Sequence, residues 1–261
     1  MTKTPKYRLI VCDLDDTLAE TKQPIEETMA QLLWQLTDTY DFCVITGGTY
    51  QQIKRNVIER LPHGSSRNLH RFHAMSTSGS VYHRYDDQQE KWSIIYSHLL
   101  AVDERENIQE VVERTVRGAG LWEPNPVGER IQDRRSQITF SALGQQASPA
   151  LKRAWDPTRT KRQALRQQIA RALPDYEVVI NGNTSIDILQ QGVDKGFGVK
   201  QLMRRTGYAR EEIIFFGDSL QPGGNDYPVL ELGVDSVEVD GWQQTERYLR
   251  KLLAPPYEVS V

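Results

Sequence analysis

The feature that most constrains the fold is a series of short apolar runs that alternate with helical patterns. Tyr7–Cys12 and Phe42–Ile45 are nearly continuous apolar runs, which is typical of strands buried on both faces of a parallel sheet. Ile25–Leu36 and Tyr50–Leu61 follow them in turn and carry apolar residues at helical spacing. This strand–helix–strand–helix order predicts right-handed βαβ units, and therefore a doubly wound, mainly parallel α/β sheet.

The end of the chain repeats this pattern, and the middle does not. Near the end we expect strands at Ile213–Phe216 and Val237–Val239, and helices at Gly198–Thr206, Val229–Leu232 and Thr245–Leu253. In the middle, the strand candidates alternate between apolar and polar residues, as antiparallel strands with one solvated face do. They are Val81–Ile95, Ile131–Ser141, Glu177–Ile180 and Ser185–Leu189, with helices expected at Glu104–Val116 and Thr160–Leu173. We therefore expect residues 1–86 and 187–261 to form the α/β core, and residues 87–186 an inserted α+β domain with an antiparallel sheet.

Composition narrows the class of protein. The 261 residues carry a net charge of -3, with 26% charged and 38% hydrophobic residues, as in an ordinary globular chain. This balance gives no support to a nucleic-acid or membrane partner. Cys12 and Cys43 are too few for a disulfide scaffold or a structural zinc site. The apolar run that ends at Cys12 is too short for a signal peptide or a membrane span, so we expect a cytoplasmic protein.

Acidic residues directly follow the first expected strand, in Asp13-Leu14-Asp15-Asp16-Thr17-Leu18. Ligands of open α/β sheets gather at the carboxyl ends of the strands, so these acids lie where a site is expected. Asp13 and Asp15 share one face of an extended chain. Such a pair can bind a hard cation, or divide into a nucleophile and a general acid/base. The alternative is a carboxylate-rich turn that caps the next helix.

Three other motifs follow along the chain. Thr46-Gly47-Gly48 comes after the second strand, where a hydroxyl and free backbone N–H groups can hold a phosphate. Lys195 stands ahead of a helix, and alone it predicts only a solvated surface cation. Asp218 follows the strand at Ile213–Phe216, with Gly223-Gly224-Asn225-Asp226 close behind, which suits a metal ligand with supporting neighbours.

In this order the four motifs resemble those of the haloacid dehalogenase superfamily of phosphotransferases. The resemblance implies that Asp13 is the nucleophile, which forms an aspartyl-phosphate, and that Asp15 is the general acid/base. It also implies that Thr46, Gly47 and Lys195 hold the phosphate and that the cofactor is Mg²⁺. The implied metal ligands are Asp13, the backbone carbonyl of Asp15, Asp218, Asn225 and Asp226. Phosphoryl transfer needs an in-line nucleophile and positive charge around the phosphoryl oxygens, and these groups supply both.

The insertion resembles the type-IIB cap of that superfamily, and most of the chain is similar to eukaryotic-type phosphomannomutases. The likeness is clearest in Ser185-Ile186-Asp187 and in Phe216–Asp226. It implies that Arg134, Ser185 and Asp187 contact a sugar phosphate, and that a homodimer through the cap is a possible assembly. Lys22 and Lys152 fall near family arginines and are expected to bind substrate.

One departure bears on the reaction. Gln145 stands where the family has an arginine, and an amide carries no charge. A mutase must bind a bisphosphorylated intermediate in two orientations, whereas a phosphatase needs one. The sequence therefore favours a Mg²⁺-dependent phosphatase of a small phosphorylated sugar. The alternative is a phosphomannomutase or phosphoglucomutase that interconverts hexose 1- and 6-phosphates.

The inserted domain is locally basic. Residues 130–171 contain ten Lys or Arg against two acids, a balance of +8, which would draw a phosphorylated substrate to the cleft. Within it, Lys161, Arg162 and Arg166 are expected to form a solvated helix face. No aromatic platform accompanies these charges, which argues against nucleic acid.

Two other classes of protein are consistent with part of the pattern. A receiver domain also takes phosphate on an aspartate, but it is about half this length and its phosphoacceptor follows a middle strand. A non-catalytic sugar-phosphate binder would not need the full set of acids. Elsewhere, His70 and His73 could meet on one helical face, but without a third ligand we expect a surface role for them.

Overall fold

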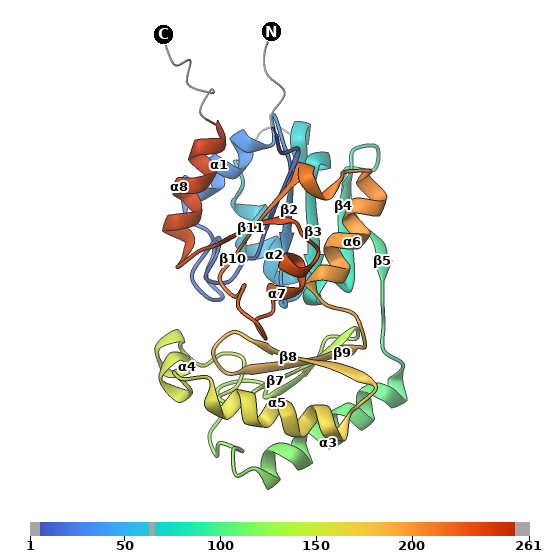
Figure 1. Ribbon diagram of the computed structural model, residues 1–261, viewed down its shortest axis with the longest axis vertical. Coiled ribbons are helices and arrows are strands. Elements are labelled where there is room, and N and C mark those ends of the chain that lie inside the picture. The colour runs from blue at the N-terminus through green and yellow to red at the C-terminus, as the bar shows by residue number, and fades with distance from the viewer. Residues whose placement is uncertain (1–5, 63–65, 254–261) are drawn as a thin grey trace.

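The computed structural model describes residues 6–62 and 66–253, which fold into a larger and a smaller body (Figure 1). The larger body is built on a seven-stranded sheet in the order β11-β10-β1-β2-β3-β4-β5. Its strands are β1 (Leu9–Cys12), β2 (Asp41–Ile45), β3 (Phe72–Ser76), β4 (Val81–Asp86), β5 (Lys91–Ser97), β10 (Ile213–Gly217) and β11 (Asp235–Glu238). Neighbours from β11 to β3 pair in parallel, and β4 and β5 extend the sheet antiparallel. The predicted mainly parallel α/β sheet is confirmed.

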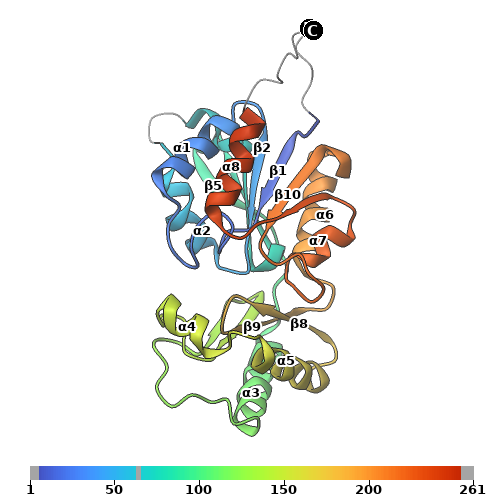
Figure 2. The same ribbon diagram turned by 60° about the vertical axis from the view of Figure 1, so that its left-hand side comes forward.

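Helices cover both faces of this sheet, as its apolar strands require (Figure 2). Ile10 and Cys12 point to one face, where α1 (Glu27–Leu36), α2 (Tyr50–Asn56) and α8 (Trp242–Leu253) pack. Leu9 and Val11 point to the other, where α6 (Lys195–Thr206) and α7 (Tyr227–Glu231) pack. Four short 3₁₀ turns complete the described part of this body: η1 (Ile58–Arg60), η2 (Ser66–Arg71), η3 (Thr77–Gly79) and η4 (Arg210–Glu212).

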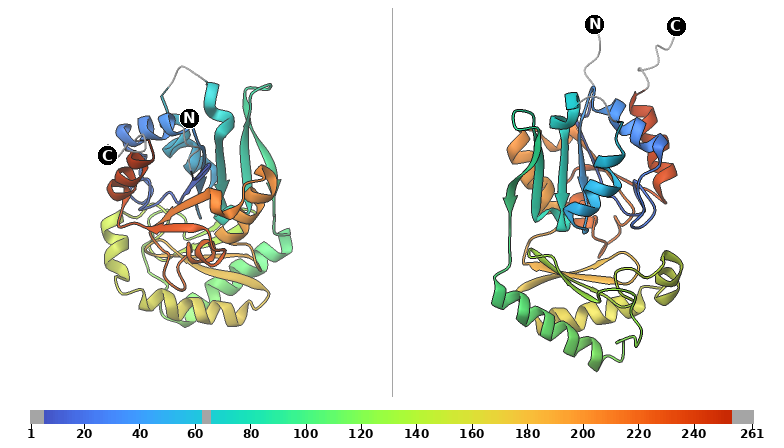
Figure 3. Two further views of the ribbon diagram at one scale, coloured as in Figure 1. Left: turned by 45° about the horizontal axis from the view of Figure 1, so that its top comes forward. Right: turned by 180° about the vertical axis from the view of Figure 1, so that it is seen from behind.

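The smaller body is the cap, which has a sheet and a core of its own. Its four strands pair antiparallel in the order β6-β7-β9-β8. The elements are α3 (Val102–Gly118), β6 (Ile131–Asp133), β7 (Gln137–Ser141), α4 (Pro149–Trp155), α5 (Thr160–Ala172), β8 (Tyr176–Asn181) and β9 (Ser185–Gln190). The sheet faces the larger body, and α3 and α5 lie on its far side (Figure 3). The cap therefore presents strand residues, not helices, to the carboxyl ends of the core strands.

The strand pairing suggests other domain limits than those expected from sequence. Strand β5 pairs with β4 in the larger sheet, beyond the expected core limit at residue 86. The expected limit at residue 187 falls inside β9, which pairs with β7 and β8 in the cap. We therefore propose residues 98–191 as the inserted domain in place of 87–186.

Strand β3 lies between β2 and β4, although no strand is expected there from sequence. Its pattern is broken by polar residues that the fold buries. His73 is fully buried and its Nδ1 lies 2.6 Å from the Tyr82 hydroxyl, so the expected surface role for His73 is wrong. His70 lies in η2 and not on a shared helical face with it. Among the described residues, no helix is long and apolar enough to cross a membrane.

Candidate active site

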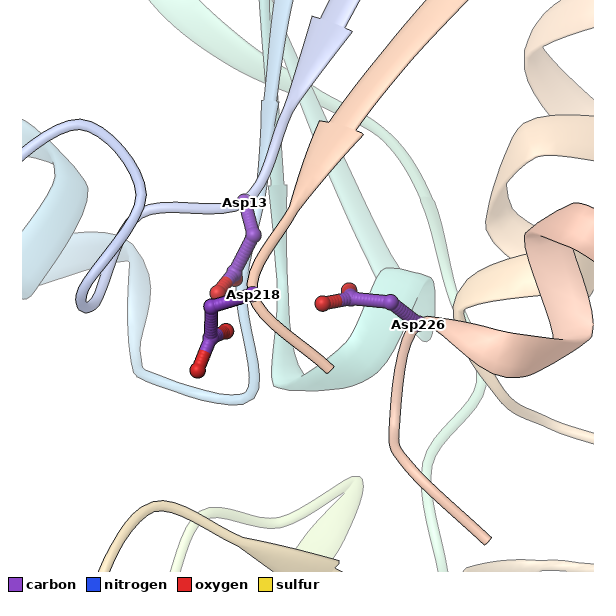
Figure 4. Close-up of side chains that lie close together, drawn as sticks. All are labelled: Asp13, Asp218 and Asp226. Atoms are coloured by element: carbon purple, nitrogen blue, oxygen red, sulfur yellow. The ribbon is translucent and has the colours of Figure 1, made fainter. Parts of the chain in front are cut away.

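Four chemistry-bearing residues of the sequence motifs meet at one edge of the larger sheet. Asp13 directly follows β1, Thr46 follows β2, Asp218 follows β10, and Lys195 is the first residue of α6. Because β1, β2 and β10 are parallel neighbours, their carboxyl ends lie side by side. In Figure 4, Asp13 and Asp218 come from adjacent strand ends, and Asp226 points toward them from the start of α7.

Lys195 bridges two of these acids. Its Nζ lies 2.7 Å from Asp13 Oδ1 and 2.6 Å from Asp226 Oδ1, with all three side chains buried. Burial raises the pKa of Asp13 well above its usual range, although Lys195 lowers it, and Asp226 and Asp218 raise it further. The same burial, followed by the charge of Asp226, raises the pKa of Asp218 to about 7. One ammonium is therefore paired with two buried carboxylates, and the third, Asp218, lies nearby and is partly buried.

The acidic cluster fits a hard cation. Asp13, Asp218 and Asp226 can each offer a carboxylate oxygen within 4.8 Å of the others. Asp226 already uses Oδ1 for Lys195 and accepts at Oδ2 from the Ser219 backbone N–H, at 3.1 Å. Within the described part of the chain, Asp218 has one side-chain hydrogen bond, a long contact of 3.4 Å from the Ser219 hydroxyl. The excess negative charge and the oxygen donors suit a divalent metal ion such as Mg²⁺, with Asp13 and Asp218 freer than Asp226 to bind it.

The loop after β2, residues Thr46–Gly48, contacts the cap. The Thr46 hydroxyl accepts from the Gly48 backbone N–H at 3.0 Å. The Gly47 carbonyl accepts from two cap side chains, Arg134 Nη1 at 2.6 Å and Gln137 Nε2 at 3.1 Å. A Cβ on Gly47 would lie 1.9 Å from Asn181 Nδ2, so a larger residue here would require the Asn181 side chain to move. The predicted Thr46–Gly47 segment is therefore where core and cap meet.

Asp15 turns away from Lys195 and faces the cap. Its carboxylate accepts from the Lys22 backbone N–H at 2.5 Å and from Gln52 Nε2 at 3.0 and 3.1 Å. Burial raises its pKa, which the two donors partly offset. Gln52 was not predicted, because nothing in the sequence marks one polar residue of α2 as pointing back to Asp15.

Lys22 of the core lines the cavity next to Asp15, together with Arg134, Gln145 and Lys152 of the cap. Lys22 Nζ donates to Gln145 Oε1 at 2.6 Å, and Lys152 Nζ donates to the Gln145 carbonyl at 2.9 Å. Burial, followed by the charges of Lys152 and Arg134, lowers the pKa of Lys22 to about 7. Asp15 is the one carboxylate among the lining residues, so the charge of this cavity suits an anion.

This cavity is small. It holds about 30 Å³, far below the roughly 300 Å³ of an ordinary small-molecule pocket. A neighbouring cavity of about 260 Å³ shares Lys22, Arg134 and Gln145 with it.

The remaining predicted cap residues lie close to this cavity. Ser185 lines it, and Asp187 lies behind Asn181, whose Nδ2 donates to Asp187 Oδ2 at 2.7 Å. Asn225 Nδ2 donates across the interface to Asn181 Oδ1 at 3.3 Å. The unpredicted Asn181 thus contacts both the cap acid and the loop that precedes Asp226.

One expectation about the cap charges is wrong. Arg162 is not part of a solvated face, because it is buried and its Nε lies 2.9 Å from Asp156 Oδ2. Lys161 is exposed as expected. In the basic segment 130–171, Asp156 therefore neutralises Arg162, and this ion pair has a structural role.

Comparisons with known proteins agree with this architecture. The sequence profile of the haloacid dehalogenase-like hydrolases matches residues 130–238. A probable phosphomannomutase of Caenorhabditis elegans is 22% identical over 253 residues, which cover 94% of this chain and 95% of that protein. The phosphomannomutase of Encephalitozoon cuniculi is 25% identical over 259 residues, which cover 94% of each chain.

Solved structures share the fold at lower identity. An IMP-bound mutant of the Plasmodium falciparum IMP-nucleotidase is 14% identical, with a TM-score of 0.71 over 95% of this chain; the match spans 66% of the nucleotidase. A haloacid dehalogenase-like hydrolase from Bacteroides thetaiotaomicron is 15% identical, with a TM-score of 0.59 over 95% of this chain and 100% of that one.

The fold, the motif residues and these matches resemble those of capped α/β hydrolases. The resemblance to the haloacid dehalogenase-like hydrolases rests on the profile match at residues 130–238 and on similarity over nearly the whole chain at 22–25% identity. The two relatives described above are a probable phosphomannomutase and a phosphomannomutase.

Proposed function

We propose that the protein is a Mg²⁺-dependent phosphatase that hydrolyses a small phosphorylated sugar through an aspartyl-phosphate on Asp13. The observation that carries this proposal is the placement of Asp13 against Lys195, with Asp15 two residues on and turned toward the cap cavity. A nucleophile, a phosphate-binding cation and an acid on the leaving-group side are the parts that stepwise phosphoryl transfer needs.

In the first half-reaction, an oxygen of Asp13 attacks the phosphorus in line with the ester oxygen. Asp13 Oδ1 contacts Lys195, so the ammonium lies beside the transferring phosphoryl group and can balance charge on its oxygens. The Thr46 hydroxyl accepts from the Gly48 backbone N–H and keeps its own proton to donate to the same group. As the P–O bond to the sugar breaks, Asp15 gives its proton to the leaving oxygen. Its raised pKa favours the protonated form that this step requires.

In the second half-reaction, Asp15 is a carboxylate and takes a proton from water. The water oxygen attacks phosphorus, the bond to Asp13 breaks, and inorganic phosphate leaves with Asp13 regenerated. A Mg²⁺ bound by Asp13, Asp218 and the Asp15 carbonyl, with Asn225 and Asp226 nearby, would supply charge neutralisation between nucleophile and phosphate. Lys195 and Asp226 would hold Asp13 in place while the reaction proceeds.

The contacts of Gln145 favour hydrolysis over the mutase reaction, in which the phosphate moves between two positions of the sugar. Its amide faces the cavity and its Oε1 accepts from Lys22, where a guanidinium could have gripped a second phosphate with two parallel bonds. A phosphatase holds its substrate in one orientation and tolerates this change.

A second candidate, a phosphomannomutase or phosphoglucomutase, has one observation in its favour. Lys22, Arg134 and Lys152 still converge on the cavity next to Asp15. Three cations there would suit the distal phosphate of a hexose bisphosphate.

The test is an assay of mannose 1-phosphate and a panel of sugar phosphates with Mg²⁺, each with and without a hexose 1,6-bisphosphate. Free phosphate and sugar-phosphate isomers are followed together. We expect phosphate release that does not depend on the bisphosphate. Bisphosphate-dependent isomerisation with little release would instead establish the mutase.

A further inference from the structure

The 3₁₀ turn η3 has an unusual backbone. Thr77, Ser78 and Gly79 have φ angles of 48°, 56° and 85°, so three consecutive residues adopt the left-handed region. This region is disfavoured for residues with a side chain, and most of all for a β-branched one such as Thr77. All three residues are buried, directly after β3 at the carboxyl edge of the sheet. Such backbone persists only where surrounding contacts hold it.

The turn also contacts the loop Thr46–Gly48, which we call the phosphate loop because the proposed function places the phosphoryl group there. The Thr77 backbone N–H donates to the Gly48 carbonyl and the Ser78 backbone N–H donates to the Thr46 carbonyl, each at 2.8 Å. These carbonyls flank Gly47 on both sides. The left-handed conformation is what aims two successive N–H groups at one loop, because an extended strand would point them to opposite sides.

A cluster of buried hydroxyls ties the same turn to the cap. Thr77 Oγ1 lies 2.6 Å from Ser80 Oγ, and Ser136 Oγ lies 2.9 Å from Thr77 Oγ1 and 3.0 Å from Ser80 Oγ. Ser136 belongs to the cap, in the turn between β6 and β7, and is 1% exposed. Ser136 lies one residue from Gln137, whose side chain contacts the Gly47 carbonyl. The cap therefore reaches the phosphate loop both directly and through Thr77.

The turn also contacts the helix that carries Lys195. A Cβ on Gly79 would lie 2.7 Å from Gly198 Cα, a backbone atom of the first turn of α6. This close approach fixes the start of α6, and with it Lys195, relative to the turn.

We propose that the left-handed turn Thr77–Gly79 is a positioning element. It fixes the phosphate loop and the start of α6 relative to each other, and it couples both to the cap through Ser136. Thr77 and Ser136 act through Thr46–Gly48 and touch no reacting atom. The expected effect of this turn on kcat rests on the proposed phosphatase function. The coupling between the turn, the phosphate loop and the cap does not depend on that function.

A matched pair of substitutions at Thr77 tests the coupling without substrate. Thr77→Ser keeps the hydroxyl, and Thr77→Val keeps the branched shape but loses it. Hydrogen exchange read by mass spectrometry on the full chain reports the protection of the segments 44–52 and 74–82, with β1 and β10 as internal references. We expect exchange in both segments to be about tenfold faster in Thr77→Val, while Thr77→Ser resembles the wild type. Ser136→Ala should match Thr77→Val.

A glycine pair tests the contact with α6. Gly79→Ala and Gly207→Ala both place alanine at positive φ, 85° and 77°, but nothing lies within 4 Å of a Cβ on Gly207, at the other end of α6. We expect both variants to lose thermal stability because of the left-handed backbone, and Gly79→Ala to lose more because its Cβ meets Gly198. Binding of beryllium fluoride with Mg²⁺, which mimics a phosphorylated aspartate, should weaken about tenfold or more only in Gly79→Ala.

The outcomes separate the two proposals. Unchanged exchange in Thr77→Val, or faster exchange in every segment including β1 and β10, would overturn the positioning role whatever the enzyme does. If exchange responds as expected, kcat on the best substrate of the panel should fall about tenfold in Thr77→Val, with KM within about twofold, and recover in Thr77→Ser. An absence of any phosphatase activity in the wild type would contradict the proposed function and leave the exchange result standing.

Discussion

Lys195 Nζ and Asp13 Oδ1 lie 2.7 Å apart in a pair with almost no exposure to solvent. The pair joins the first strand to the start of α6, which are 182 residues apart in the chain. A buried ammonium is costly unless it is paired, and here it is paired twice, since Asp226 also contacts it. The same contacts that stabilise the fold place a cation beside the proposed nucleophile.

Removing this ammonium should destabilise the protein. Lys195→Met leaves Asp13 and Asp226 unpaired beside Asp218, so we expect the metal-free protein to lose about 3–5 kcal/mol of free energy of unfolding. Urea unfolding at neutral pH measures the loss. Lys200→Met, on the exposed side of the same helix, is the control and should change little. Equal midpoints for the two variants would show that the buried pair carries no stability.

Mg²⁺ should stabilise the folded chain through Asp218. An ion that binds only the folded state stabilises it by about 2.7 kcal/mol at a hundred times its dissociation constant, so the melting temperature should rise with added Mg²⁺. Asp218→Asn should lose this rise. It should cost no stability without metal, because burial already disfavours this charge and raises the pKa of Asp218 to about 7. The exposed Asp240→Asn is the control, and an undiminished rise in Asp218→Asn would contradict the assignment.

Restoring a cation at position 145 should strengthen bisphosphate binding. Gln145→Arg adds a guanidinium beside Lys22 and Lys152, so we expect about tenfold tighter binding of a hexose 1,6-bisphosphate, by calorimetry with Mg²⁺. Gln146→Arg adds the same charge on an exposed neighbour and controls for long-range attraction. If both variants bind alike, the cavity does not use position 145 for a second phosphate.

His83 should make the protein sensitive to acid. Its ring is stacked on Tyr50 with a centroid distance of 3.8 Å, and burial lowers its pKa from 6.5 to about 4. Between these pH values the unfolded chain binds a proton that the folded chain does not, so stability falls as the pH drops through this window. His83→Phe keeps the stacked ring and cannot be protonated.

Urea unfolding of the wild type and of His83→Phe between pH 7 and 4.5 provides the measurement. His73, whose pKa burial also lowers, is present in both proteins, so the difference between them isolates His83. We expect the wild type to lose stability relative to the variant as pH falls. Parallel curves would rule out a contribution from His83.

Much of the sheet and of the candidate site at its edge could be predicted from sequence. Continuous apolar runs identified β1, β2 and β10, and parallel strands have coincident carboxyl ends, so residues placed just after them must lie together. Asp13, Thr46 and Asp218 needed no knowledge of tertiary contacts beyond this. Lys195 could not be placed in this way, because one lysine before a helix forms no recognisable pattern. Only the resemblance to a family placed it in the site.

What escaped prediction depends on packing between distant segments. Strand β3 contains His73, whose burial is possible only because Tyr82 and Asp41 approach it from neighbouring strands. From sequence, Arg162 is expected at the surface, but it is buried because it forms an ion pair with Asp156. Asn181 has no local signal, because its contact with Asp187 depends on the pairing of β8 with β9, and its contact with Asn225 depends on the cap lying against the core.

The most direct test of the central claim is to trap the phosphoryl group on Asp13. The wild type is mixed with Mg²⁺ and the best substrate of the panel, quenched in acid within milliseconds, digested and analysed by mass spectrometry. We expect one added phosphoryl group on the peptide that contains Asp13, its loss on longer incubation as phosphate is released, and its absence in Asp13→Asn with the fold intact. Steady turnover by Asp13→Asn, or a phosphoryl group on another residue, would contradict the account.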